Sequence, residues 1–187
     1  MKSNSGFTVL GAGLVAVIVV MLIMFGMSYV SYNNLGAAMD AQVKAEWTNN
    51  QNILSSYTLK VKEAAHVPDK YQAALKDIVS STFHGRYGDN GSQATVQWIR
   101  ENNIQFDASM YKQIQQIIES GRNDFKVSQT KLIDLKRQYE VEQNSVWSGF
   151  WLRMTGYPKV PLSQYTVVIE AGTTEKFKTG VDQEVKF

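Results

Sequence analysis

The stretch SGFTVLGAGLVAVIVVMLIMFGMSYV, residues 5–30, decides how the rest of this 187-residue chain is interpreted. No Asp, Glu, Lys, Arg or His occurs between Lys2 and Asp40. At about 1.5 Å per residue, a helix over residues 7–30 covers the roughly 30 Å hydrocarbon core of a bilayer. Two tyrosines stand where interfacial aromatic residues are expected. The stretch therefore predicts a transmembrane helix, whose membrane-spanning residues include Phe7, Leu10, Val15, Val20, Leu22, Phe25 and Tyr29.

A buried core helix, a cleavable signal peptide and a pilin-type assembly helix are the alternatives to an anchor. Core helices rarely run this far without a charge, and a signal peptide has a shorter apolar region followed closely by small residues. Gly6-Phe7 resembles the processing site of type IV prepilins. In that family a glutamate used in assembly normally stands where this chain has Gly11. We therefore expect residues 1–30 to be an uncleaved anchor, and a pilin-like subunit processed before Phe7 is an alternative.

Composition argues against several classes of function. Lys and Arg total 19 against 17 Asp and Glu, which leaves no clustered positive charge for nucleic-acid binding. The chain has no cysteine, which excludes disulfides and thiolate chemistry. Its two histidines, His66 and His84, lie in no zinc-binding arrangement. We expect no catalytic residues, no metal site, no cofactor and no nucleic-acid partner, so the chain is not expected to be an enzyme.

Helical periodicity continues after the apolar stretch. The residue before Pro68 should leave the helical region, so the first of these helices should end there. A second helix should run from Pro68 to Phe83, and Ser92 can cap a short helix after it. Asn50, within the first seam, should either fix the register or face water. Bulky residues follow a four–three step typical of a helical seam at Val43, Trp47, Leu54, Tyr57, Val61 and Ala64.

The clearest helical pattern is the third, a four–three register from Ile114 to Val146. A glycine inside a helix costs about 1 kcal/mol against alanine, so at Gly121 we expect a neighbouring helix to approach closely. Residues 107–151 would form one helix of about 65–70 Å. The predicted fold is all-α: a single N-terminal transmembrane helix, an elongated antiparallel three-helix bundle of coiled-coil type over residues 31–157, and a short extended C-terminal tail over residues 158–187 with a strand-like stretch at 165–172.

The aromatic residues after the third helix form the best candidate interaction site. In an up-down-up bundle they would lie at the end away from the anchor. They would either cover that end, packing near Val67, or contact a second protein or a second membrane. The candidate residues are Trp147, Phe150, Trp151 and Tyr157.

The region from Tyr32 to Pro158 resembles the LemA family of small prokaryotic and phage-encoded membrane proteins. That family has a single span, a Tyr-Asn-x-Leu segment, a helix with a tryptophan, an Arg-x-Tyr helix and an aromatic tail. The resemblance implies a helical architecture and a membrane location, and the family has no established enzymatic activity to carry over. Residues 54–59 depart from the usual Arg-Arg-x-Asp-Leu-Ile-Pro-Asn-Leu segment. The matching positions are Tyr32-Asn33-Asn34-Leu35, Trp47, Arg137-Gln138-Tyr139, Phe150-Trp151 and Gly156-Tyr157-Pro158.

These observations predict a single-pass membrane protein that acts as a scaffold or adaptor by contacting proteins or membranes. Its partners would be the lipid bilayer and a protein not identifiable from the sequence, a second copy of the chain being one option. Lys2 favours a cytoplasmic N-terminus, in a bacterial inner membrane or in a host membrane if the chain is phage-encoded. A phage lysis factor of the inner-membrane spanin kind, also a single span with a helical rod, is a further alternative.

Overall fold

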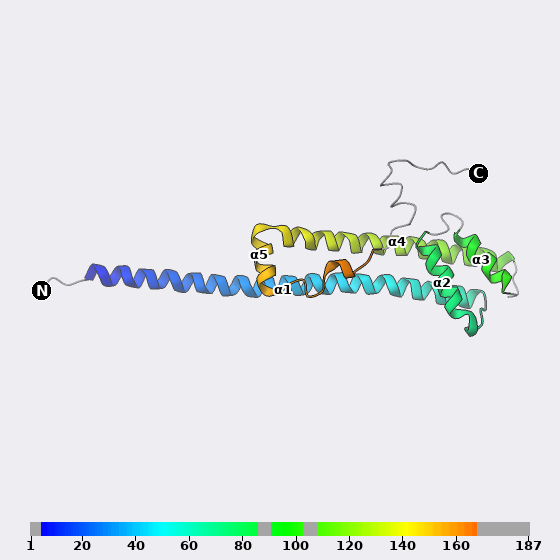
Figure 1. Cartoon of the computed structure of the whole chain (residues 1–187), viewed down its shortest axis with the longest axis horizontal. Coiled ribbons are helices and arrows are strands. Elements are labelled where there is room, and N and C mark those ends of the chain that lie inside the picture. Colours follow the sequence, from blue (N-terminus) through cyan, green and yellow to red (C-terminus); the bar gives the residue numbers. More distant parts are fainter. Residues whose placement is uncertain (1–4, 86–90, 103–107, 168–187) are drawn as a thin grey trace, which may run out of the picture. The chain divides into compact units, whose positions relative to one another are not determined.

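The computed structural model describes residues 5–85, 91–102 and 108–167. Within these residues the chain forms five α-helices and no strand (Figure 1). The all-α prediction is therefore confirmed, and residues 168–187 of the expected tail lie outside the described residues. Two 3₁₀ turns complete the secondary structure, at Asp69–Tyr71 and Leu162–Gln164. The helices are α1 (Ser5–Ala64), α2 (Gln72–Phe83), α3 (Gly91–Glu101), α4 (Ala108–Asn144) and α5 (Val146–Thr155).

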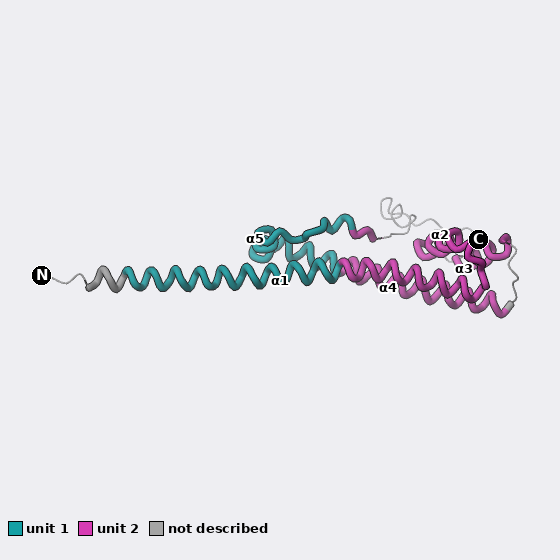
Figure 2. The backbone as a smooth tube through the Cα atoms, turned by 90° about the horizontal axis from the view of Figure 1, so that it is seen from below, with its two compact units in different colours: residues 1–43, 135–164 teal, residues 44–134, 165–187 magenta. Residues whose placement is uncertain are grey.

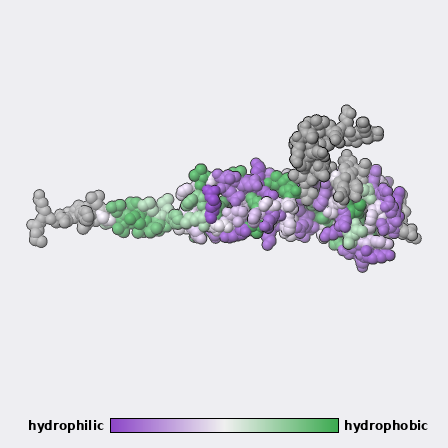
Figure 3. Space-filling view, viewed as in Figure 1, coloured by the Kyte–Doolittle hydropathy of each residue, from purple (hydrophilic) through white to green (hydrophobic). Residues whose placement is uncertain are grey.

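Helix α1 contains the apolar stretch and continues past it without a break, since no proline precedes Pro68. It ends at Ala64, as the proline predicts. The described side chains of its apolar part are exposed on all sides of the helix, and Figure 3 shows that hydrophobic residues cover this segment. The helix is long and apolar enough to cross a membrane. All seven residues predicted to lie in the membrane are on α1, and Val20 and Leu22, for example, are 55% and 66% exposed.

The chain divides into two compact units (Figure 2). Unit 1 comprises residues 1–43 and 135–164, and unit 2 comprises residues 44–134 and 165–187. Helices α1 and α4 are each divided between the two units, with one segment in unit 1 and the other in unit 2. Helix α5 belongs to unit 1, whereas α2 and α3 belong to unit 2.

The hydrophobic core of unit 2 is formed by α1, α2, α3 and α4. Threonines hold α2 against α3: Thr82 and Thr95 are fully buried, and the hydroxyl of each donates to the carbonyl of Gly91. The seam predicted along α1 and α4 supplies much of the core, together with apolar residues of the two shorter helices. Its fully buried members are Val61, Ala65, Leu75, Val79, Ile99 and Ile114, and Tyr57, Phe83, Ile118 and Phe125 are nearly as well covered.

The close approach expected at Gly121 is confirmed. A Cβ atom built on this residue would overlap the ring of Phe83 and lie 2.7 Å from the ring of Tyr57. Neither ring is free to retreat. Tyr57 donates to Asp124 and pairs with Ser120 through its hydroxyl, and its ring meets that of Phe83 edge to face. The glycine therefore lets α4 approach two aromatic side chains that are fixed in place.

A buried polar network joins α1 to α4 in unit 2. Glu46 is 5% exposed, and its Oε1 accepts hydrogen bonds from Ser128 at 2.6 Å and from Asn49 at 3.0 Å. Its Oε2 lies 2.8 Å from the ammonium of Lys131. Asn50 is also buried and donates to the Glu46 carbonyl, so of the two alternatives for this residue, a position facing water is wrong. At Glu46, polar contacts therefore join α1 to α4 in addition to the apolar contacts of the seam.

Burial alone would raise the pKa of Glu46. The hydrogen bonds from Lys131, Ser128 and Asn49, together with the charge of Lys131, outweigh that effect and lower the pKa below its usual value. Glu46 is therefore ionised over the physiological range. A carboxylate whose pKa is lower in the folded than in the unfolded chain stabilises the fold above its unfolded pKa. That stabilisation is lost as the pH falls through the folded value.

The expected single helix over residues 107–151 is wrong. Helix α4 ends at Asn144, Ser145 adopts an extended backbone with ψ of 143°, and α5 begins at Val146. The four–three register holds through buried Tyr139 and fails at Val146, which is 91% exposed. The physical reason is that the chain folds back at Ser145 onto α1, instead of continuing along it.

We predict that Gly121→Ala destabilises the protein although alanine is the better helix former. The gain in helix propensity is about 1 kcal/mol, whereas overpacking against fixed rings costs about 1–3 kcal/mol or more. Thermal unfolding of the full chain in detergent micelles, followed by circular dichroism, measures the difference. Asn123→Ala on the exposed face of α4 is the control and should leave the melting temperature unchanged or slightly higher. Equal stability of Gly121→Ala and wild type would contradict the close approach.

We predict that Glu46→Gln destabilises the protein at pH 7 by about 2 kcal/mol, a typical value for hydrogen bonds to a charged group. It should also flatten the loss of stability between about pH 5 and pH 3, the range below the ordinary carboxylate pKa of about 4.3. Unfolding measured across this pH range tests both effects. The control is Asp69→Asn. The pKa of Asp69 is also lowered, by a hydrogen bond from Lys62 and by the charge of that lysine, but Asp69 is exposed. This variant therefore separates the effect of a buried carboxylate from that of an exposed one. An acid response of Glu46→Gln matching wild type would refute the assignment.

Candidate functional site: the aromatic helix α5

Helix α5 is separated from α4 by a sharp turn that its own sequence makes possible. The hydroxyl of Ser148 donates to the carbonyl of Glu142 at 2.9 Å, which satisfies one of the carbonyls left unpaired at the end of α4. A Cβ atom on Gly149 would overlap the backbone carbonyl of Gln143. The Ser148-Gly149 pair therefore lets the first turn of α5 lie directly against the last turn of α4.

The other end of α5 is closed by a glycine cap. Gly156 has a φ of 74°, in the left-handed region that glycine adopts without strain. Its N–H donates to the Arg153 carbonyl, and the N–H of Tyr157 donates to the Leu152 carbonyl at 2.9 Å. These bonds pair carbonyls at the end of the helix and direct the chain back along α1.

Trp151 is the centre of a cluster of five aromatic rings in unit 1. Its side chain is 2% exposed. Its ring centroid lies 4.7 Å from that of Phe25, and its ring stacks on Tyr32 at 6.1 Å with an interplanar angle of 3°. Trp147 and Phe150 meet the same ring edge to face at 5.8 Å and 5.3 Å. The cluster thus attaches α5 to the C-terminal end of the apolar part of α1.

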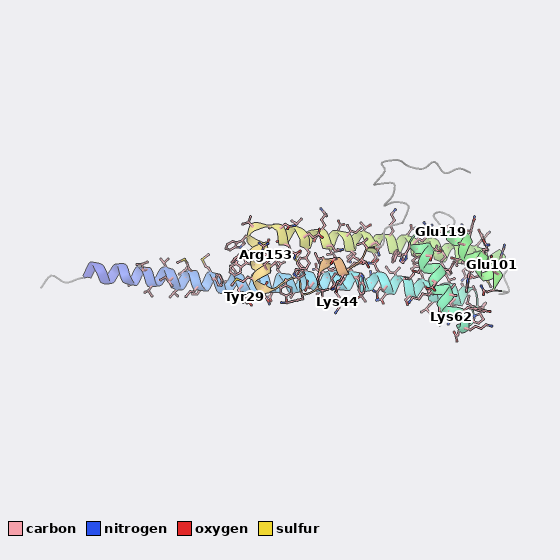
Figure 4. The ribbon with its side chains drawn as sticks, in the orientation of Figure 1. Tyr29, Lys44, Lys62, Glu101, Glu119 and Arg153 are labelled. Carbon is pink, nitrogen blue, oxygen red and sulfur yellow. The ribbon has the colours of Figure 1, made fainter. Side chains whose placement is uncertain are left out.

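This position corrects the sequence-based expectation. The aromatic residues were expected at the end of the bundle away from the anchor, either covering residues near Val67 or contacting a second protein or a second membrane. Instead, Trp151 packs on Phe25, which lies inside the apolar stretch itself. In Figure 4, Tyr29 and Arg153 lie at the same level along α1.

The four predicted interaction residues have different environments. Trp147 is 61% exposed and Phe150 is 50% exposed, whereas Trp151 is buried and Tyr157 is half-buried. A Cβ atom on Gly36 would overlap the Tyr157 ring, so this glycine lets that ring lie on α1. Only Trp147 and Phe150 therefore offer a large aromatic surface to a partner, and Trp151 and Tyr157 hold the helix in place.

Asp40 holds three segments of unit 1 together, a role that no sequence pattern indicated. One of its carboxylate oxygens accepts from the Tyr139 hydroxyl at 2.8 Å, and the other accepts from the backbone N–H of Lys159 at 2.9 Å. It thus ties both α4 and the segment after α5 to α1. The signal that could have revealed it is its place in the chain, as the first ionisable side chain after the apolar stretch.

A shallow groove of about 460 Å³ lies between α1 and α4 in unit 1. Its lining is mixed, and Arg137 and Glu142 are its ionisable members. The remaining lining residues are Leu35, Ala38, Met39, Gln42, Gln138 and Val141.

Among the described residues, no group of three or more His, Asp or Glu side chains could hold a metal ion.

Comparisons with known proteins found no match to a protein-family model, to a characterised protein or to a solved structure.

We predict that Trp151→Ala lowers the stability of the full chain in micelles by about 3–5 kcal/mol, the usual cost of removing a buried large aromatic side chain. Trp151→Phe should cost clearly less. It keeps a ring against Phe25 and removes the indole N–H, which is buried without a hydrogen-bond partner. Thermal unfolding measures both. Trp147→Ala, at an exposed ring on the same helix, should change stability little. A loss for Trp147→Ala as large as for Trp151→Ala would contradict this division of roles.

Proposed function

We propose that this chain is a single-pass membrane protein that acts by binding, as a helical scaffold or adaptor, and not by catalysis. The observation that carries the proposal is the state of α1. A helix that is apolar all round belongs in a protein core or in lipid, and the apolar part of α1 is exposed within the described residues. Lipid is the environment in which that surface is stable.

We infer that the helices after the span pack as an antiparallel bundle. The support comes from the pairing of α1 with α4 in unit 2. Glu46 pairs with Lys131, whereas Tyr57, further along α1, pairs with Asp124 and Ser120, which come earlier on α4. Two helices are antiparallel when residues with higher numbers on one contact residues with lower numbers on the other, as these do. The LemA resemblance agrees with this arrangement and with a role in binding.

The proposed topology has the N-terminus in the cytoplasm and residues 31–187 on the other side of the membrane. It rests on Lys2, because positive charge favours the cytoplasmic side of a span. The partner of the scaffold is a protein, and a second copy of this chain is one candidate.

We predict that the bulk of the chain is cleaved by protease added to intact spheroplasts of an expressing bacterium. The natural absence of cysteine provides a sharper version of this test. Ser55→Cys, on the exposed side of α1, should react with a membrane-impermeant maleimide in intact spheroplasts. Asn4→Cys is the matched control and should react only after permeabilisation.

Reaction at Asn4→Cys alone in intact spheroplasts would reverse the topology. N-terminal sequencing of the membrane-extracted protein separates the anchor from the pilin-like alternative. A mature protein that starts at Phe7 would show processing and would contradict an uncleaved anchor.

A further inference from the structure

We propose that α5 is an interfacial helix, whose exposed apolar face lies in the headgroup–acyl boundary of the same bilayer that α1 crosses. This inference rests on the proposed anchor and adds a second, lateral contact with lipid. It assigns a role to Trp147 and Phe150, the exposed members of the aromatic cluster, because the contacts within unit 1 do not explain why these rings are exposed.

The position of α5 along α1 is the first argument. Trp151 contacts Phe25, inside the apolar stretch, and Tyr32, just past its end. These two residues are about 10 Å apart along the axis of a helix with a rise of 1.5 Å per residue. The boundary between the hydrocarbon core and the headgroups is a layer of similar thickness. The cluster therefore attaches α5 to the part of α1 that crosses this boundary.

The chemistry of the exposed face is the second argument. Successive turns of α5 expose large apolar side chains on one face, while Trp151, Leu152 and Thr155 point to the buried face. Tryptophan is enriched at membrane interfaces, where its apolar ring and its N–H are both accommodated. The exposed apolar residues are Val146 at 91%, Trp147 at 61%, Phe150 at 50% and Met154 at 49%.

Charge at the border of this face is the third argument. Arg153 is exposed and lies beside the apolar stripe on the helix, so its stem can follow the apolar surface while its guanidinium reaches the phosphates. A helix that exposes aromatic and other apolar side chains, with a basic residue at the border of that face, is suited to binding at the membrane interface.

Continuity with the span favours lipid over a protein as the occupant. Tyr29 and Val30 of α1 are exposed at 43% and 57%, at the level at which α5 packs. The exposed face of α5 extends the apolar surface that the span presents to lipid. A protein covering this face would have to compete with the bilayer that already surrounds the span.

Spin labelling of the full chain in vesicles of phosphatidylethanolamine and phosphatidylglycerol tests the proposal. Labels are placed on single cysteines at Phe150→Cys and Met154→Cys, and each is measured for collision with oxygen, which partitions into lipid, and with a water-soluble nickel chelate. Two reference sites are Val20→Cys in the span and Val127→Cys, an exposed valine on α4 in unit 2. The ratio of oxygen to nickel collisions should rise in the order Val127, then Phe150 and Met154, then Val20.

Each other outcome overturns a specific statement. If Phe150 and Met154 match Val127 while Val20 remains lipid-exposed, α5 faces water and the interfacial helix is wrong, although the anchor stands. If Val20 also matches Val127, the proposed membrane anchor itself fails. If the spectrum of either single-cysteine variant is broadened by the label on a neighbouring copy and sharpens on dilution with unlabelled protein, a second copy of the chain covers this face. Met154 is not one of the five aromatic residues of the cluster. Its label therefore reports the environment of α5 even if Phe150→Cys disturbs the cluster.

Discussion

The packing of Trp151 between Phe25 and Tyr32 is the constraint on which unit 1 depends. It requires the chain to turn back at the end of α4, and the residues that permit the turn are found there. Ser148 pairs a carbonyl of the last turn, and Gly149 allows contact with the backbone. Asp40 then fixes the returning segment through the backbone N–H of Lys159. Together these three contacts bring the indole ring of Trp151 to the end of the apolar stretch and keep it there.

Unit 2 is held together on a different principle. Its seam is mostly apolar, but Glu46, Asn50 and Ser128 are buried within it. A buried charge is costly unless it is paired and hydrogen-bonded, and Glu46 has three partners. Such a network contributes less to net stability than its contacts suggest, because desolvation offsets them. Its effect is on register, since a slip of α1 along α4 would leave the carboxylate buried and unpaired.

Much of the helical organisation could be predicted from the sequence. An absence of charges indicated the long apolar helix, Pro68 indicated the end of α1, and a mid-helix glycine indicated the close contact at Gly121. These signals are local, and they reflect backbone geometry or the solvent preference of single residues. They do not depend on where distant parts of the chain meet.

The fold-back into α5 could not be predicted because the four–three spacing continued past the turn. Glu142 and Val146 occupy seam positions by spacing alone, and nothing in the pattern separates a seam residue from an exposed one after the helix has ended. The location of the aromatic cluster depended on the direction of the long helix. The expected up-down-up order makes this helix run away from the apolar stretch, whereas Tyr139 of α4 contacts Asp40 and the earlier Asp124 contacts Tyr57. The end of α4 therefore lies beside the part of α1 that is nearer the apolar stretch. The seam spacing left two alternatives open for Asn50, and it could not decide between them because the partner of Asn50 is a backbone carbonyl one turn earlier, which the pattern of side chains does not report.

The contacts between the two ends of unit 1 also have a consequence for the order in which the chain becomes structured. Asp40 and Lys159 are separated by 119 positions in sequence, so almost the whole chain must leave the ribosome before unit 1 can close. Contacts of such long range form slowly because a large loop must be ordered first. The apolar stretch, by contrast, is synthesised first. The apolar part of α1 is therefore available early and docking of α5 is a late event, and until docking occurs Phe25 and Tyr32 lack the ring of Trp151 as a neighbour.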